Sequence, residues 1–200
     1  MPPEPSTPQN LIRPGLVRLL GVVLLSVWLA GTLMEWYVAT QNFKTVDRVL
    51  TAPTEALGEQ SKPLEAARLR VLFRYLASEL NRHYFHSWGW AQMALGLALV
   101  GLWVGMKLRD RASWALLGSM LLIVVGLHFA VMPQLVELGR TLDFVSRDLL
   151  SSQLASQLAP PWAPQMDRFW KLHAAFTGLD GVKLLLGLGL LARQLHLIRK

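Results

Sequence analysis

The sequence predicts an all-α protein that lies in a membrane as a bundle of four helices. Two observations lead to this fold class. Of the 200 residues, 52% are hydrophobic, and the mean hydropathy is positive at +0.34. Four windows are also long and apolar enough to cross a hydrocarbon core about 30 Å thick, which takes roughly 20 residues of helix. We therefore expect an integral membrane bundle whose main partner is the lipid bilayer.

The predicted spans, in chain order, cover residues 16–39, 87–106, 112–132 and 172–192. The first ends at Glu35, Trp36 and Tyr37, residues typical of a membrane interface. The fourth is the least regular, because it carries an acid and a base inside an apolar run. Residues 1–13 are rich in proline and polar side chains and are expected to form a disordered tail, whereas 14–200 form a single membrane domain.

The net charge of +7 is explained by basic residues near the span ends, so no nucleic-acid partner is expected. Four spans put both termini and the short connection after residue 106 on the same side. Basic residues gather on that side: Arg13, Arg18, Lys107, Arg109, Arg111, Arg193, Arg199 and Lys200. The positive-inside rule predicts that this side, with both termini, is cytoplasmic. We expect the plasma (inner) membrane in preference to an organelle.

The two long connections on the other side are expected to be helical in part. Residues 64–86 and 135–149 each carry leucines three and four apart, so we expect these non-cytoplasmic extensions to pair with each other. Pro133 is expected to kink the third helix without ending it. Residues 51–63 are predicted to be a loop, and Asp167 is predicted to cap the last helix.

Small residues on the second and fourth spans suggest how the helices pack. Helices in lipid associate through small residues that let backbones approach closely. The residues that fit this pattern are Ala94, Ala98, Gly101, Gly105, Gly178 and Gly181. Packing within the bundle is the favoured interpretation, and self-association in a homo-oligomer is the alternative.

Ionisable and polar residues on all four spans form the candidate functional cluster: Glu35, His86, His128, His173, Thr177, Asp180 and Lys183. Four spans place Glu35 and the three histidines at similar depth. Asp180 and Lys183 are three residues apart on one helix and are expected to neutralise each other, or else to line a proton or ligand pathway. In a further alternative, Lys183 snorkels toward the cytoplasmic interface.

The histidines also raise the question of a cofactor. His128 and His173, from different spans, have the residue type of axial haem ligands, but a structural or Glu35-linked role is favoured for them. His83 and His86 alone make only a weak metal motif, so no metal and no cofactor are expected. The chain has no cysteine, which excludes disulfides and thiolate chemistry. No nucleotide-binding or hydrolase motif is present, and we expect no enzymatic activity.

Several of these segments together are similar to a known family. Its marks here are Phe73 before Tyr84-Phe85-His86, a third span that continues past a proline to Glu137 and Arg140, and the opening Phe169-Trp170-Lys171-Leu172-His173. This arrangement resembles the transmembrane protein 205-like family of small four-span membrane proteins, whose shared domain is of unknown function. The resemblance covers most of the chain from Leu16 onward and implies a multi-pass membrane protein without established catalysis. The charges inside the last span depart from the family pattern.

Three functions remain open from the sequence. The leading hypothesis is an accessory or assembly component, or a homo-oligomeric bundle, within a larger membrane complex. The second is a small transporter or proton-coupled conduit that uses His173, Thr177, Asp180 and Lys183 on the fourth helix. The third is a haem- or quinone-binding redox subunit.

Overall fold

The computed structural model describes residues 14–62, 65–143 and 162–198, and the regular structure in these ranges is entirely helical. The helices are α1 (Pro14–Thr51), α2 (Glu55–Ser61), α3 (Ala66–Gly105), α4 (Arg111–Gly126), the π-helix η1 (Leu127–Val131), α5 (Met132–Leu142) and α7 (Ala163–Ile198). The all-α prediction is thus confirmed. The expected tail at 1–13 and the end of the expected leucine pattern at 144–149 lie outside the described residues.

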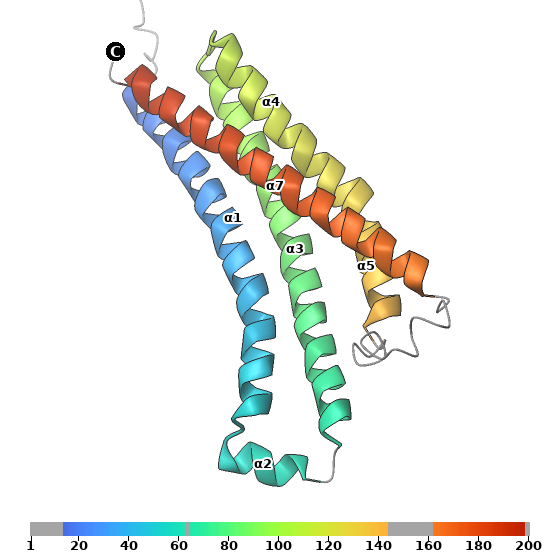
Figure 1. Cartoon of the computed structure of the whole chain (residues 1–200). Coiled ribbons are helices and arrows are strands. Elements are labelled where there is room, and N and C mark those ends of the chain that lie inside the picture. The colour runs from blue at the N-terminus through green and yellow to red at the C-terminus, as the bar shows by residue number, and fades with distance from the viewer. Residues whose placement is uncertain (1–13, 63–64, 144–161, 199–200) are drawn as a thin grey trace, which may run out of the picture.

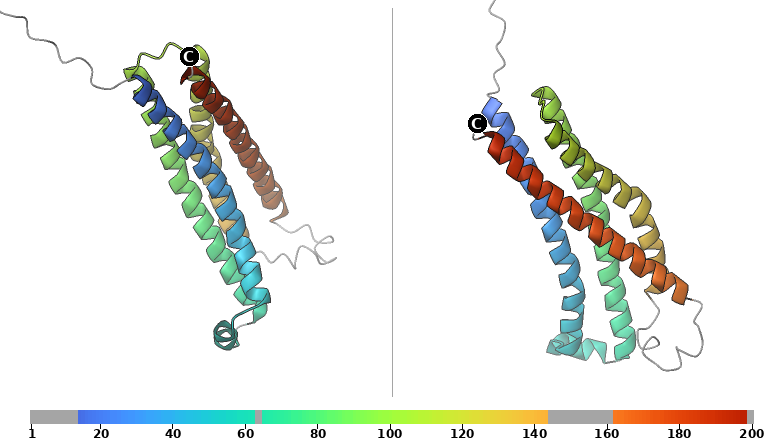
Figure 2. Two further views of the ribbon diagram at one scale, coloured as in Figure 1. Left: turned by 90° about the vertical axis from the view of Figure 1, so that its left-hand side faces the viewer. Right: turned by 45° about the horizontal axis from the view of Figure 1, so that its top comes forward.

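Four helices are long and apolar enough to cross a membrane: α1, α3, the continuous run from α4 to α5, and α7. Figures 1 and 2 show α1 and α3 side by side, joined by α2, with α7 crossing in front of the bundle. The start of α1 and the end of α7 lie at the same end, where Arg18 Nη1 donates to the carbonyl of Leu197 at 2.9 Å. The predicted four-helix bundle is confirmed by this arrangement.

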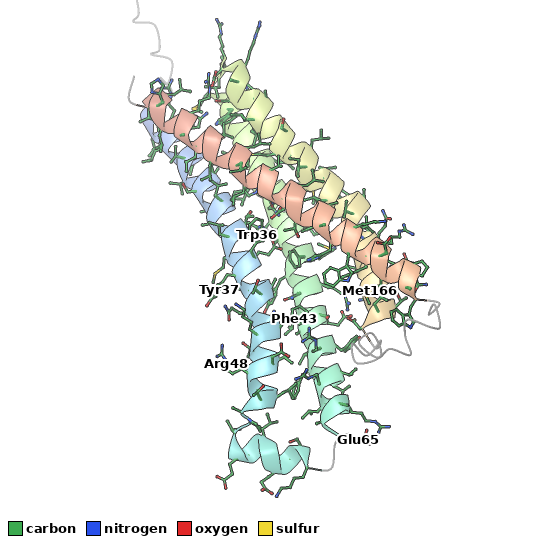
Figure 3. The ribbon with its side chains drawn as sticks, viewed as in Figure 1. Trp36, Tyr37, Phe43, Arg48, Glu65 and Met166 are labelled. Atoms are coloured by element: carbon green, nitrogen blue, oxygen red, sulfur yellow. The ribbon has the colours of Figure 1, made fainter. Side chains whose placement is uncertain are left out.

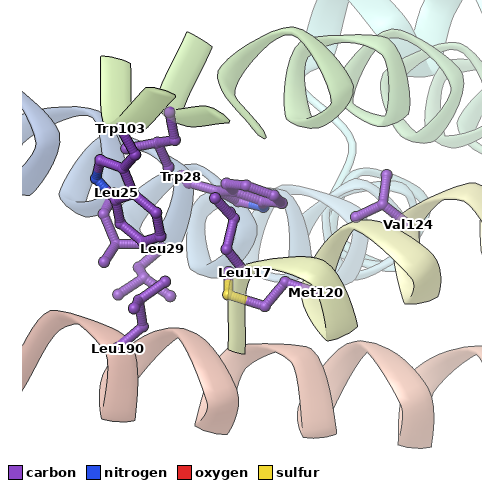
Figure 4. Packing of buried hydrophobic residues seen from close by; sticks show 9 residues of the cluster. Leu25, Trp28, Leu29, Trp103, Leu117, Met120, Val124 and Leu190 are labelled. Carbon is purple, nitrogen blue, oxygen red and sulfur yellow. The ribbon is translucent and has the colours of Figure 1, made fainter. Parts of the chain in front are cut away.

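The apolar core lies in the half of the bundle that holds the termini. All four long helices contribute side chains to it (Figure 4): Leu25, Trp28, Leu29, Leu99, Trp103, Leu117, Met120, Val124 and Leu190. Trp28 and Trp103 are the largest of the fully buried side chains. This core fixes the relative positions of α1, α3, α4 and α7 between the termini and the polar site described next.

The third membrane-spanning segment, which consists of α4, η1 and α5, changes direction at the π-helix η1 (Figure 1). Pro133 lies two residues after the end of η1 and has no backbone N–H, so the α-helical hydrogen-bond ladder loses one bond there. A π-turn absorbs this disruption without ending the helix, which is how such bulges commonly arise. The expected kink is therefore confirmed, and His128, which lies in η1, is buried.

The first half of α3 pairs with residues 39–47 of α1, most of which lie beyond the predicted span and received no specific prediction from the sequence. Asn42 donates to Asn81 at 2.6 Å, Asn81 donates to the Ala39 carbonyl at 3.1 Å, and Arg74 pairs with Asp47 at 3.2 Å. The expected leucine seam is wrong, because Leu72, Leu76 and Leu80 are exposed.

Ion pairs, and not leucines, connect α3 with α5. Arg82 contacts Asp143 at 2.7 Å and Glu79 at 2.6 Å, and Arg140 reaches the same Glu79 at 3.3 Å. The two extensions therefore meet through a charged network of partly buried side chains.

Two local predictions are corrected. Part of the predicted loop at 51–63 is the short helix α2, which Thr54 caps by accepting a hydrogen bond from Leu57 N at 3.4 Å. The last helix begins at Ala163, so Asp167 is not its cap. Asp167 instead lies one turn inside the helix and pairs with Lys171 at 2.7 Å.

Candidate functional site: a buried polar chamber

The site is built around two charged residues on α7. Asp180 is 2% exposed and Lys183 is 1% exposed, and their side chains form an ion pair across one helical turn. Lys183 therefore points into the bundle, and the snorkelling alternative is wrong. Two charges taken out of water need each other and further hydrogen bonds to be tolerated.

Neutral side chains from α1 and α3 supply those hydrogen bonds. Trp36 Nε1 donates to Asp180 Oδ2 at 2.7 Å, and Lys183 Nζ donates to Gln92 Oε1. The same Gln92 oxygen accepts from Trp28 Nε1 at 2.9 Å. The ion pair on α7 is thus tied by hydrogen bonds to α1 and to α3.

A small cavity of about 20 Å³ adjoins the ion pair, and we call it the inner chamber. Its lining residues are Glu35, Phe85, Gly89, Gln92, Val124, Leu127, His128, Met132, Phe176, Asp180 and Lys183. Two buried atoms in this lining, Glu35 Oε1 and His128 Nδ1, have no hydrogen-bond partner among the described residues. A Cβ at Gly89 would overlap the His128 ring, so only glycine leaves room for that histidine.

A larger cavity of about 400 Å³, the outer cavity, lies toward the α2 end between α1, α3, α5 and α7. Its walls are mostly aromatic and apolar, and Figure 3 shows Trp36 and Phe43 reaching in from α1 while Tyr37 points away. Polar groups also line it: Thr40, Ser78, Asn81, Arg82, His173 and Thr177. The volume and this mixture are typical of a small-molecule site.

The two cavities share three wall residues, Phe85, Met132 and Phe176. Phe85 and Phe176 contact each other edge to face, with ring centroids 5.6 Å apart. These three side chains therefore form the partition between the outer cavity and the inner chamber.

The structure brings four of the predicted cluster residues together in the inner chamber, namely Glu35, His128, Asp180 and Lys183. His173 and Thr177 lie elsewhere, in the wall of the outer cavity. His86 is exposed, and its ring centroid is 5.2 Å from that of His128. Because His128 and His173 line different cavities, they do not form the bis-histidine haem site that the sequence left open.

Three site residues were missed by the sequence analysis: Gln92, Trp28 and Trp36. The search followed ionisable groups, and these side chains are neutral. Gln92 could have been found as a primary amide within an otherwise apolar span, since such a group needs a partner inside the bundle. Trp36 was interpreted as an interface residue and is instead a hydrogen-bond donor to the buried acid.

The predicted packing glycines need correction as well. A Cβ at Gly101, Gly105 or Gly178 would meet no atom within 4 Å, and at Gly181 it would meet only Trp36 at 3.9 Å. Ala94 and Ala98 are likewise exposed. Close packing uses other glycines, Gly31, Gly89, Gly96 and Gly187, where a Cβ would overlap a side chain of a neighbouring helix. The favoured interpretation of packing within the bundle therefore does not hold for the predicted set.

Comparison with known proteins adds no further constraint. No family model, curated protein or solved structure matches the chain. The resemblance to the transmembrane protein 205-like family stays a prediction from the sequence. Within the described ranges, no group of three or more His, Cys, Asp or Glu side chains could hold a metal ion.

Proposed function

We propose that this four-helix membrane protein is a small proton-coupled conduit in which Glu35 binds the proton. The observation that carries the proposal is the Glu35 carboxyl group, which lines the inner chamber with one oxygen unpartnered among the described residues. Ionisable groups inside a membrane bundle are costly, and they mark proton or solute pathways by default.

The charges of the chamber single out Glu35. Asp180 and Lys183 compensate each other and are hydrogen-bonded on both sides. Glu35 has no cation of its own, so the chamber is electrically neutral when Glu35 is protonated and carries one uncompensated negative charge when it is not. Burial of an unpaired charge is unfavourable. Glu35 is therefore the group that gains and loses the proton, while the ion pair keeps its charges.

The outer cavity supports the proposed proton conduction, because it adjoins the inner chamber and is large enough to admit water or a small solute. Phe85, Met132 and Phe176 line both spaces. Rotation of these side chains would connect them without moving a helix, and side-chain rotations are fast compared with helix motions.

A flux assay tests the proposal. The protein is reconstituted into vesicles that contain a pH-sensitive dye, and a pH step is applied outside. Wild-type protein should carry protons faster than protein-free vesicles, and Glu35→Gln should abolish that excess because it keeps the shape and removes the titrating group. The matched control is Glu137→Gln, at an exposed position on α5. Undiminished flux in Glu35→Gln would refute the proposal.

A second candidate function, an oligomeric or accessory bundle, has an observation of its own. Ala94, Ala98, Gly101 and Gly105 form an exposed face of small residues on α3 that no helix of the described chain covers. Gly101→Leu should then lower the particle mass measured in mild detergent. An unchanged mass, or a monomeric wild type without a co-purifying protein, would count against this function.

A further inference from the structure

The outer cavity is larger than a path for water requires. Its volume of about 400 Å³ lies in the range of about 300–1,000 Å³ that is typical of sites for small ligands. Thr40 of α1 and His173 and Thr177 of α7 line the cavity and are exposed, so it opens between these two helices. Because α1 and α7 are both long and apolar enough to cross a membrane, this opening lies on the side of the bundle, where a lipid-soluble molecule can enter.

The apolar part of the lining is rich in aromatic rings, which come from three helices: Trp36, Phe43, Phe85, Phe169 and Phe176. Phe85 and Phe176 support each other edge to face at 5.6 Å. The hydrogen bond from Trp36 Nε1 to Asp180 at 2.7 Å holds the indole in place. Aromatic rings prefer edge-to-face or offset-stacked contact with other rings. This lining therefore favours a ligand that is itself a planar ring.

The charges around the outer cavity indicate that the ligand is uncharged. Arg82 is the permanently charged side chain among the lining residues, and it already pairs with Glu79 at 2.6 Å and with Asp143 at 2.7 Å. The carboxylates of Glu35 and Asp180 line the inner chamber instead. A charged ligand would find no unpaired opposite charge in the outer cavity, and burying an unpaired charge is unfavourable.

Two neutral polar side chains in the lining are available to a ligand. The Ser78 hydroxyl on α3 and the His173 imidazole on α7 have no hydrogen-bond partner within the described residues. The His173 ring is stacked on Phe169, with centroids 5.9 Å apart and an interplanar angle of 9°. Other polar side chains of the lining are already bonded within the protein: Thr40, Asn81 and Thr177. Ser78 and His173 can therefore each donate a hydrogen bond to a ligand from a different helix.

We propose that the outer cavity binds an uncharged ring compound of the quinone class, with Ser78 and His173 donating hydrogen bonds to its carbonyl oxygens. A quinone combines the planar apolar ring that the aromatic walls favour with acceptor oxygens at its edge. A lipid tail would fill the apolar part but would give neither Ser78 nor His173 a partner. This binding does not rest on the proton function of Glu35, because Glu35 does not line the outer cavity.

Equilibrium dialysis of the protein in detergent against radiolabelled dimethylnaphthoquinone tests the site, with the uptake by protein-free micelles subtracted. The two methyl groups block addition of protein nucleophiles to the quinone ring, and the chain has no cysteine. Wild-type protein should bind one quinone per chain in a saturable manner. Dimethylnaphthalene, which has the same two fused rings without carbonyl groups, should bind about tenfold more weakly. Methylnaphthoquinone sulfonate, which adds a negative charge, should also bind more weakly.

Substitution of the two donors identifies the site. His173→Phe retains a ring that can stack on Phe169 but removes the hydrogen bond, so it should weaken quinone binding about tenfold and leave dimethylnaphthalene binding unchanged. Ser78→Ala should weaken quinone binding to a similar extent. The matched controls are His83→Phe and Ser87→Ala, at exposed positions of α3 that do not line the cavity, and both should bind as wild type does.

Three results would overturn the inference: no saturable binding above that of the micelles, dimethylnaphthalene bound as tightly as the quinone, or wild-type quinone affinity in both His173→Phe and Ser78→Ala. Glu35→Gln should bind the quinone as wild type does. Quinone binding by a protein that carries no proton flux would therefore support the quinone site while refuting the proton conduit, and flux without quinone binding would do the reverse.

Discussion

At the scale of single residues, the pair Asp180–Lys183 shows how the unfavourable free energy of burying two charges is offset. Trp36, Gln92 and the partner charge satisfy its polar atoms from three helices. A sequence reader can predict that an acid and a base three residues apart on a helix will pair. Which neutral side chains contact the pair depends on how α1 and α3 pack beside α7. The spacing of residues within α7 cannot predict that packing.

The ion pair should behave as a unit in stability measurements. Asp180→Asn alone leaves a buried ammonium without its carboxylate and should destabilise the protein by about 3–5 kcal/mol, as breaking buried pairs does. The double variant Asp180→Asn with Lys183→Met removes both charges and should be markedly more stable than Asp180→Asn alone. Unfolding in detergent, followed by circular dichroism, measures both. A double variant no more stable than Asp180→Asn alone would contradict this account.

At the scale of helices, the end of the bundle near the termini is held by a second polar contact. Asp110 caps α4 by accepting from Ser113 N at 3.3 Å, and Arg193 of α7 donates to both of its oxygens at 2.6 and 2.5 Å. The hydrogen bonds from Arg193, followed by that from Ser113, hold the pKa of Asp110 well below its usual value of 3.8. The contact ties the start of α4 to the last turns of α7.

This lowered pKa predicts how stability depends on pH. A carboxyl group whose pKa is lower in the folded state stabilises the fold fully above its usual pKa, and the contribution disappears as the pH falls through and below that value. The thermal midpoint in detergent should therefore fall more steeply below about pH 4 for wild type than for Asp110→Asn. Asparagine retains the capping oxygen, so the comparison isolates the ion pair. Parallel curves for the two proteins would show that the pair contributes nothing.

The sequence predicted the spans well and the extensions poorly, for a physical reason. A membrane span can be recognised from the length and apolar composition of its own sequence, because charged residues are excluded from the hydrocarbon. The extensions depend on which helix lies opposite. The leucines of 64–86 have the spacing of a helix–helix seam, yet Asn81 and Arg74 on the same helix find their partners on α1. Nothing in the spacing of those leucines identifies α1 as the partner.

At the scale of the whole molecule, the site depends on the topology. Each of the four membrane-spanning helical segments contributes at least one residue to the inner chamber: Glu35, Gln92, His128 and Asp180. These residues meet only because the four segments pass the chamber at the same depth in the bundle. The sequence analysis placed Glu35 and the histidines at similar depth from the span count alone. That argument left open whether these residues converge. It could not tell that Glu35 and His128 line the inner chamber while His173 lines the outer cavity, because the rotation of each helix decides which cavity a side chain lines.

The topology can be measured directly because the chain has no native cysteine. Single cysteines at the half-buried position Gly58 and at the exposed positions Arg109 and Ile198 would be labelled in sealed vesicles with a maleimide that does not cross membranes. The account predicts that Arg109→Cys and Ile198→Cys react from the same face, and that Gly58→Cys reacts only from the opposite face. Labelling of Gly58→Cys and Arg109→Cys from the same face would contradict the four-span bundle, and with it the buried chamber.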